Sequence, residues 1–257
     1  MKFGFVTCVK IGLSCMEAIY KKGVKLDFAL TLPDNIAKKK SGRVYIQDFC
    51  NHHNIPLLKS DDVNNQEVIE NIKKNNIDWL FIVGWSQIAY SKVLKAPKRG
   101  VIGMHPTLLP EGRGRASIPW CIIKDLKKTG VTMFKMDTGI DTGPIISQIE
   151  ISLKKKITAT TLYDKIVEAH VHLVQKTIKP LLLNKIKLAP QNQSKASTWP
   201  GRKPEDGKIA VSGATGGVGS LAVAILAKLG YQVSAISGKT TEKGFLAELG
   251  ATEILNR

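Results

Sequence analysis

The sequence predicts an α/β protein with a doubly wound, Rossmann-like sheet of mostly parallel strands. Short apolar runs suited to buried strands, such as residues 3–8 and 79–83, alternate with segments of helical periodicity. The chain has 257 residues, of which 43% are hydrophobic, and this is enough material for a substantial core. Ligands of such sheets bind beyond the carboxyl ends of the strands, so the loops that follow the strands are where chemistry is expected.

The expected elements follow one another in a regular order. Strands are expected at residues 3–8, 26–32, 79–83 and 101–104, and helices at residues 12–20, 43–53, 64–76 and 117–128. A strand pair at residues 131–136 and 144–151 and a long helix at residues 158–183 complete the series. Ser117 is a suitable N-cap for the helix that it begins. The loops after Val83, Met104 and Met136 are therefore the candidate site loops.

The net charge of +17 favours a lysine-rich soluble surface over a nucleic-acid site. Of the 38 basic residues only six are Arg, the side chain preferred for bidentate contacts with phosphates and bases. The runs at residues 38–40 and 154–156 are expected in solvated loops, and the first could flank an anionic ligand. Nucleic acid is therefore not an expected partner.

Cysteine spacing and hydropathy predict a cytoplasmic protein. Cys8, Cys15, Cys50 and Cys121 form no CxxC pair, which disfavours structural disulfides and a zinc knuckle. His52 and His53 lack other ligand-type residues at metal spacing, so no metal site is expected. No segment has the roughly 18 apolar residues of a spanning helix, and the N-terminus does not have the pattern of a signal peptide.

A change of composition divides the chain. Nearly all the net charge lies before residue 209, and the remainder is rich in Gly and Ala. We expect a catalytic domain at residues 1–190, a polar linker at residues 191–207 and a short βαβ unit at residues 208–257.

Two loops carry the residues of chemical interest. His105 follows the strand at residues 101–104 and begins a stiff stretch with two prolines and a repeated Arg-Gly. Residues 137–144 form a Gly-rich turn with two carboxylates, Asp137 and Asp141. A carboxylate beside a histidine fixes its orientation and stabilises the imidazolium. We expect Asp137 to cap the turn and Asp141 to serve His105.

The stretches HPTLLPEGRGRASIPW and GVTMFKMDTGIDTGPII resemble the folate-dependent formyltransferase family, and the resemblance covers residues 1–209. It implies formyl transfer from N10-formyltetrahydrofolate to a primary amine without a metal, with His105 and Asp141 as catalytic residues. The family's Asn stands two residues before the His, where this chain has Gly103. Either a water or another side chain replaces it, or the protein is slow, or it is inactive; the first is favoured because the other motif residues remain.

The resemblance also assigns binding residues. The folate pterin is expected against the backbone of two loops, at Val83, Gly84, Trp85, Asp137, Gly139 and Ile140. The substrate is expected at Arg113, Thr107 and Gly103.

The sequence favours a nucleotide-linked amino sugar as the acceptor, such as a UDP-4-amino-4,6-dideoxy sugar of glycan or lipopolysaccharide biosynthesis. The stretch GRGRASIPW resembles the sugar N-formyltransferase subgroup. A methionyl-tRNA formyltransferase-like enzyme is the alternative. No membrane partner is expected, and a homodimer is left open.

The tail has its own motif. Residues 208–257 have the order strand, Gly-rich turn, helix, strand and helix, with the turn at residues 213–219. They resemble a fragment of the nucleotide-binding domain of medium-chain quinone or acryloyl-CoA reductases. Ser237 and Lys239 favour NADPH over NAD, but so small a unit buries too little surface to bind a dinucleotide well. We therefore expect a fused fragment without NADPH, and keep a reductase remnant as the other alternative.

Overall fold

The computed structural model describes residues 1–38, 42–203 and 206–256, which form two compact units. The first unit is Met1–Trp199 and the second is Pro200–Arg257. In the described residues no helix has both the length and the apolar character needed to cross a membrane. Lys39 and Lys40, from the first lysine run, and Pro204 and Glu205, from the predicted linker, lie outside the described residues.

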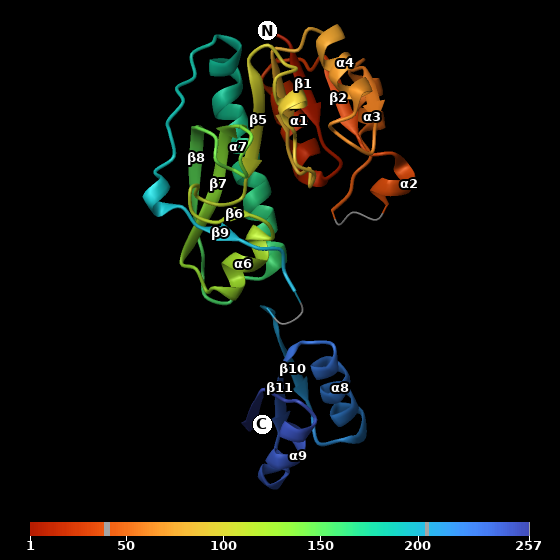
Figure 1. Ribbon diagram of the computed structural model, residues 1–257, viewed down its shortest axis with the longest axis vertical. Coiled ribbons are helices and arrows are strands. Elements are labelled where there is room, and N and C mark those ends of the chain that lie inside the picture. The colour runs from red at the N-terminus through yellow and green to blue at the C-terminus, as the bar shows by residue number, and fades with distance from the viewer. Residues whose placement is uncertain (39–41, 204–205, 257) are drawn as a thin grey trace. The chain divides into compact units, whose positions relative to one another are not determined.

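A seven-stranded sheet forms the centre of the first unit (Figure 1). Its order is β3-β2-β1-β4-β5-β7-β8. The bounds are β1 Phe3–Val6, β2 Phe28–Thr31, β3 Leu57–Lys59, β4 Trp79–Ile82, β5 Gly100–His105, β7 Lys128–Lys135 and β8 Ile145–Ser152. The first five in space are parallel, while β7 is antiparallel to both β5 and β8. The predicted doubly wound, mostly parallel sheet is confirmed.

Helices cover both faces of this sheet because successive strand residues point to opposite sides. Phe3 and Phe5 of β1 join the core under α1 (Lys10–Lys21) and α7 (Ala159–Leu182). Val6 joins the core under α4 (Gln66–Lys74) and α5 (Ser91–Leu94). The shorter helices of the unit are α2 Asp34–Ala37, α3 Gln47–His52 and α6 Ser117–Ile123.

The chain order reverses between β1 and β4, and the loops after β4 and β5 emerge at the same edge of the sheet. Strands β4 and β5 are paired with Ile82 opposite Gly103. The short strand β6 (Arg113–Gly114) follows β5 and pairs in parallel with β9 (Thr198–Trp199). A 3-10 turn, η1 (Gln193–Lys195), precedes β9. Residues that follow α7 thus return to the loop after β5.

Several predicted bounds differ from the structure for local reasons. The edge strand β3 was not predicted, and it is short and only partly buried. The helix expected at residues 117–128 ends at Ile123, because Asp125 has a left-handed φ of 43° and β7 begins at Lys128. Ser117 is inside this helix, and its N-cap is Ala116, also left-handed with φ 54°.

The predicted boundary at residue 190 also needs revision. The first unit continues to Trp199, because residues 191–199 bond to the loop after β5 rather than forming a free linker.

The second unit is a small three-stranded parallel sheet with the order β10-β11-β12. Its elements are β10 Lys208–Ser212, α8 Gly217–Lys228, β11 Gln232–Ser237, η3 Thr240–Glu242, α9 Lys243–Glu248 and β12 Glu253–Asn256. The predicted order of elements is present, and β12 follows it. The core is small, and its fully buried members are Ala214, Val223, Val233, Ala235 and Leu246.

Candidate active site

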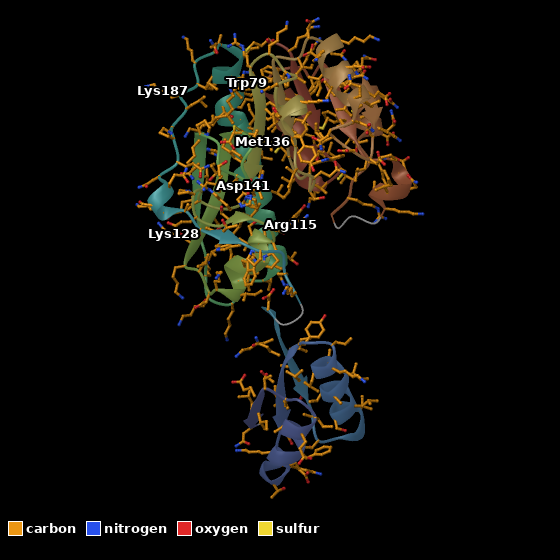
Figure 2. The ribbon with its side chains drawn as sticks, in the orientation of Figure 1. Trp79, Arg115, Lys128, Met136, Asp141 and Lys187 are labelled. Atoms are coloured by element: carbon orange, nitrogen blue, oxygen red, sulfur yellow. The ribbon has the colours of Figure 1, made fainter. Side chains whose placement is uncertain are left out.

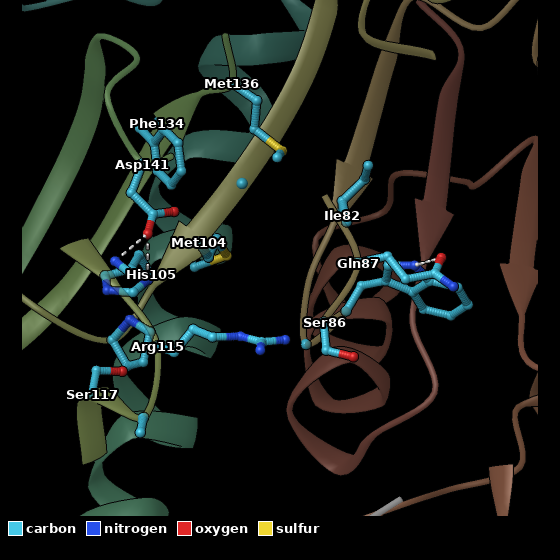
Figure 3. A pocket seen from close by; sticks show the side chains of 16 residues that line it. Ile82, Ser86, Gln87, Met104, His105, Arg115, Ser117, Phe134, Met136 and Asp141 are labelled. Carbon is cyan, nitrogen blue, oxygen red and sulfur yellow. Dashed lines mark hydrogen bonds and ion pairs between the residues drawn. The ribbon is translucent and has the colours of Figure 1, made fainter. Parts of the chain in front are cut away.

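A cavity of about 360 Å³ opens at the carboxyl edge of the large sheet. The three loops singled out by the sequence all contribute to its wall (Figure 3). Gly84–Gln87 come from the loop after β4, Met104–Pro106 from the end of β5, and Met136 and Asp141 from the connection between β7 and β8. Arg115 and Ser117 close the remaining side.

His105 is the last residue of β5, and both of its ring nitrogens face oxygen atoms. Nε2 lies 2.8 Å from the carbonyl oxygen of Gly112, to which it donates when protonated. Nδ1 lies 3.4 Å from Oδ2 of Asp141. A neutral imidazole carries one N–H and an imidazolium carries two, so only the charged ring can donate to both partners. Each ring nitrogen of His105 therefore has an acceptor beside it, a carbonyl on one side and a carboxylate on the other.

Asp141 is held on both its side chain and its backbone. Its Oδ2 accepts a hydrogen bond from the backbone N–H of Gly114 at 2.9 Å, and the dashed lines of Figure 3 mark this contact and the one to His105. Its φ of 54° is left-handed, a conformation that Asp tolerates better than most residues. The His105 and Asp141 side chains are 10% and 18% exposed, so the pair reaches the cavity but is largely shielded from water.

The loop after β4 offers mainly backbone and a short polar segment. Gly84 has a φ of 67°, and a Cβ at this position would collide with Val9. The indole N–H of Trp85 donates to Oε1 of Gln87 at 2.9 Å, which fixes that ring at the wall. Val83, also assigned to folate by resemblance, is buried in the core and does not line the cavity.

Gly103 is a close contact point for two apolar side chains. A Cβ at this position would lie 3.0 Å from both Cγ of Met136 and Cζ of Phe134. The space next to the Cβ position of Gly103 is thus occupied by apolar atoms.

The two arginines of the Arg-Gly repeat have different surroundings. Arg113, predicted to bind substrate, is buried, and its guanidinium donates to the side-chain oxygens of Gln191 and Gln193. It does not line the cavity, because these hydrogen bonds hold it behind the loop. Arg115 instead lines the cavity, and its guanidinium extends across it toward Ser86 (Figure 3). Figure 2 shows Arg115 and Asp141 in the same part of the first unit.

The remaining predicted site residues lie outside the cavity. Thr107 is buried, and its hydroxyl donates to the Gly112 carbonyl at 3.4 Å. Asp137 caps its own turn, as expected, by accepting from the N–H of Gly139 and the hydroxyl of Thr142. Ile140 is exposed beside them.

A second histidine lies behind the site on α7. His170 is fully buried, and its Nδ1–H donates to the carbonyl of Ile166 at 2.7 Å. Burial lowers the pKa of His170 to about 4, the positive charge of nearby His105 adds to this, and the hydrogen bond to Ile166 opposes it. His170 is therefore neutral at neutral pH.

Sequence reasoning missed Arg115, Ser117 and Gln191 as residues of this region. Arg115 could have been found as the second member of the Arg-Gly repeat. Gln191 lies in a stretch whose composition is typical of a linker, and nothing in its sequence neighbourhood indicated burial. In the described residues no group of three or more His, Cys, Asp or Glu side chains could hold a metal ion.

A doubly wound sheet with a shielded histidine–carboxylate pair at its carboxyl edge defines an α/β enzyme. The family model described as formyl transferase matches residues 19–178, and the chain belongs to this family.

Curated relatives match the chain over part of their length. It is 30% identical over 211 residues to the methionyl-tRNA formyltransferase of Alkaliphilus oremlandii, covering 81% of this chain and 68% of that protein. It is 34% identical over 181 residues to the enzyme of the same name from Clostridioides difficile, covering 70% of this chain and 59% of that one. The chain therefore spans 59% to 68% of the length of these two relatives.

One solved structure similar to it is an N-formyltransferase from Helicobacter canadensis in complex with folinic acid and dTDP-3-aminofucose. The TM-score is 0.61 at 21% identity, over 78% of this chain and 71% of that one. This likeness shows the fold.

Proposed function

We propose that the chain transfers the formyl group of N10-formyltetrahydrofolate to the primary amine of a nucleotide-linked amino sugar, with His105 and Asp141 as the catalytic pair. The observation that carries the reaction is the shielded contact between these two side chains at the wall of one cavity. The folate would lie against the loop after β4, where Gly84 and Trp85 present backbone and a fixed ring.

The chemistry requires one bond to form and one to break. The neutral amine attacks the formyl carbon, and the carbonyl oxygen becomes an oxyanion. Collapse of this intermediate breaks the bond from the formyl carbon to N10, and N10 takes up a proton as tetrahydrofolate leaves. In the reaction His105 would release its contact with the Gly112 carbonyl and donate its Nε2–H to the oxyanion, while Asp141 would take the proton that the amine loses.

The missing Asn leaves the oxyanion with fewer donors. The loss of one such donor costs on the order of a hundredfold or more in other enzymes. Because Met136 and Phe134 fill the space beside Gly103, a replacement donor must come from elsewhere on the cavity wall. The hydroxyl of Ser117 lines the same cavity and is the side chain we propose for this role.

Arg115 supports an anionic acceptor. Its guanidinium extends into the cavity and forms no ion pair with any described residue. Guanidinium groups match phosphate oxygens in charge and geometry. We assign Arg115, in place of Arg113, to the diphosphate of the nucleotide sugar.

A methionyl-tRNA acceptor is the second candidate, because the two curated relatives described above, which are 30% and 34% identical to this chain, are named methionyl-tRNA formyltransferases. Its phosphates would suit Arg115 equally well. The cytoplasmic location and the homodimer stay predictions.

A single-turnover assay separates these acceptors. The protein is mixed with N10-formyltetrahydrofolate and, in turn, UDP-4-amino-4,6-dideoxy sugars, dTDP-3-amino sugars and methionyl-tRNA, and tetrahydrofolate release and product mass are followed. A formylated nucleotide sugar whose formation is lost in Arg115→Gln supports the proposal. Formylation of methionyl-tRNA alone would replace the sugar with tRNA, and release on no amine would reject formyl transfer by this chain.

A further inference from the structure

Gln191 is a buried polar side chain that the reaction does not use. It lies after α7, beyond the residues that the family model matches, and is only 7% exposed. Each end of its amide is engaged by a different part of the site region. Such burial of an uncharged polar group is costly unless its hydrogen bonds are satisfied, and here they are.

One end of the amide holds the loop that carries Asp141. Its Nε2 donates to the backbone carbonyl of Asp141 at 2.8 Å and to that of Gly143 at 2.7 Å. Both N–H bonds are thereby used on two carbonyls that flank the same turn. The amide orientation follows from this, because only the NH2 side can donate.

The other end of the amide meets Arg113. Oε1 of Gln191 accepts from Nε of Arg113 at 3.1 Å and from its terminal nitrogen at 2.6 Å. Arg113 belongs to β6, whose next residue, Gly114, donates its N–H to the carboxylate of Asp141. Gln191 therefore joins the backbone of Asp141 to the strand that holds the Asp141 side chain.

The Asp141 backbone needs such support. Its φ of 54° is left-handed, a conformation that Asp tolerates but that persists only where surrounding contacts hold it. The turn is also tight, since a Cβ on Gly143 would collide with the carbonyl of Lys135. A shift of this backbone would move Oδ2 away from Nδ1 of His105, a contact already 3.4 Å long.

We propose that Gln191, together with Arg113, is a positioning residue that fixes Asp141 for its work with His105. The catalytic part of this inference rests on the proposed function. Misplacement of a reacting group by about 1 Å costs on the order of a hundredfold in rate. Gln191 thus acts through Asp141 and touches no reacting atom.

Three variants separate positioning from general stability. Gln191→Met keeps the size and removes both sets of hydrogen bonds. Gln191→Glu keeps an acceptor for Arg113, with added charge, but cannot donate to the Asp141 and Gly143 carbonyls. Gln193→Met is the matched control, because Gln193 also accepts from Arg113, at 3.1 Å from two of its nitrogens, but is exposed and bonds to no residue of the Asp141 loop.

The first readout is steady-state kinetics of the whole chain with the acceptor that the single-turnover assay identifies. We expect Gln191→Met and Gln191→Glu each to lower kcat by about 10- to 100-fold, with the KM of folate and acceptor changed less than threefold, because binding contacts are intact. Gln193→Met should keep kcat within about threefold. Equal losses in Gln191→Met and Gln193→Met, or a wild-type kcat in Gln191→Glu, would overturn the proposal.

The second readout does not depend on activity. Hydrogen exchange of the Gly114 amide, which bonds to the Asp141 carboxylate, should be accelerated at least tenfold in both Gln191 variants and not in Gln193→Met. Unchanged exchange at Gly114 would show that Gln191 does not hold Asp141. If the wild-type chain transfers no formyl group, the proposed function fails, while accelerated exchange would still support the structural link that Gln191 makes.

Discussion

The loop after β5 in the first unit and the loop after β10 in the second both follow a strand of a parallel sheet. They differ in the side chains that contact them. Around the first, His105 and Asp141 contact each other, and Gly114 and Gln191 bond to Asp141 from other parts of the chain. Around the second, the main side-chain contact is between the hydroxyls of Thr215 and Ser237, 3.0 Å apart. Glycines specify a turn, whereas a candidate site also needs side chains brought from distant segments.

Burial differs between the two units in the same sense. The first unit packs helices on both faces of seven strands, and its core takes residues from most of its elements. The second has three strands, and the apolar side chains Val218, Leu221 and Ile225 of α8, and Leu229 just after it, are exposed. The Gly-rich turn of the second unit therefore lies on a much smaller core.

The largest expected effect is on the reaction, at the first loop only. His105→Ala and Asp141→Asn should each lower kcat by roughly 100- to 10,000-fold, because each removes a group that moves or stabilises a proton. Thr215→Val, at the second loop, should leave kcat unchanged. Single-turnover rates measure this, and near-normal turnover in either first-loop variant would reject the assignment of the pair.

The next effect is on acid stability and depends on His170. Its pKa of about 4 in the folded protein is below the value near 6.5 of an exposed histidine, so the unfolded chain binds more protons between these values. The contribution of neutral His170 to the free energy of unfolding should therefore be complete above pH 6.5. The free energy of unfolding should then fall by about 3 kcal/mol as the pH drops to 4.

Urea denaturation at several pH values measures this slope for the first unit. His170→Gln should flatten the slope between pH 6.5 and 4. His172→Gln, two residues along on the same helix but exposed, is the control and should keep the slope. A His170→Gln variant with the wild-type slope would assign the acid sensitivity to other groups.

A glycine comparison gives a smaller effect. Gly103→Asn restores the family residue but places its Cβ 3.0 Å from Met136 and Phe134, so it should destabilise the first unit by about 1–3 kcal/mol through overpacking. Gly213→Asn, in the second loop, should cost less, because nothing lies within 4 Å of its Cβ and Asn tolerates its φ of 68°.

Thermal denaturation of both glycine variants checks this ranking. A Gly103→Asn protein that is as stable as the wild type and faster in turnover would show that Phe134 and Met136 yield to the amide, and would remove the argument for a replacement donor.

The smallest effect compares two valines of α8. Val223 is fully buried and Val218 is 87% exposed. Val223→Ala should destabilise the second unit by about 1.5 kcal/mol, from two buried methyl groups, and Val218→Ala by less than about 0.5 kcal/mol. Hydrogen exchange of β11 measures both. Equal costs would show that the outer face of α8 is covered in solution.

Most of the fold could be predicted because its signals are local. The alternation of strands and helices, the long helix before residue 183 and the strand pair on either side of Asp141 all follow from apolar spacing. The short edge strand β3 could not, since Leu57–Lys59 is only partly buried and lacks such a pattern. Likewise, the early end of α6 depends on the left-handed Asp125, which no periodicity reveals.

The site could be predicted where the residues that form it lie inside the sequence motifs. His105 and Asp141 were paired because they match the His and the distant Asp of the family's motifs. Arg113 was assigned to substrate because it matches the family's Arg-Gly, and the sequence alone does not show that Arg115, two residues later, lines the cavity instead. The difference arises from Gln191 and Gln193, some 80 residues further on, which bond to one arginine and not to the other.

The pairing of β6 with β9 has a consequence for synthesis on the ribosome. The seven strands and α7 are all encoded before residue 183, so the sheet can form while the chain is still growing. Gln191, Ser197 and Trp199, which bond to the Asp141 turn and to the segment from Gly112 to Arg115, emerge later. A nascent chain thus acquires its scaffold first and its finished site last, when the segment after α7 leaves the exit tunnel.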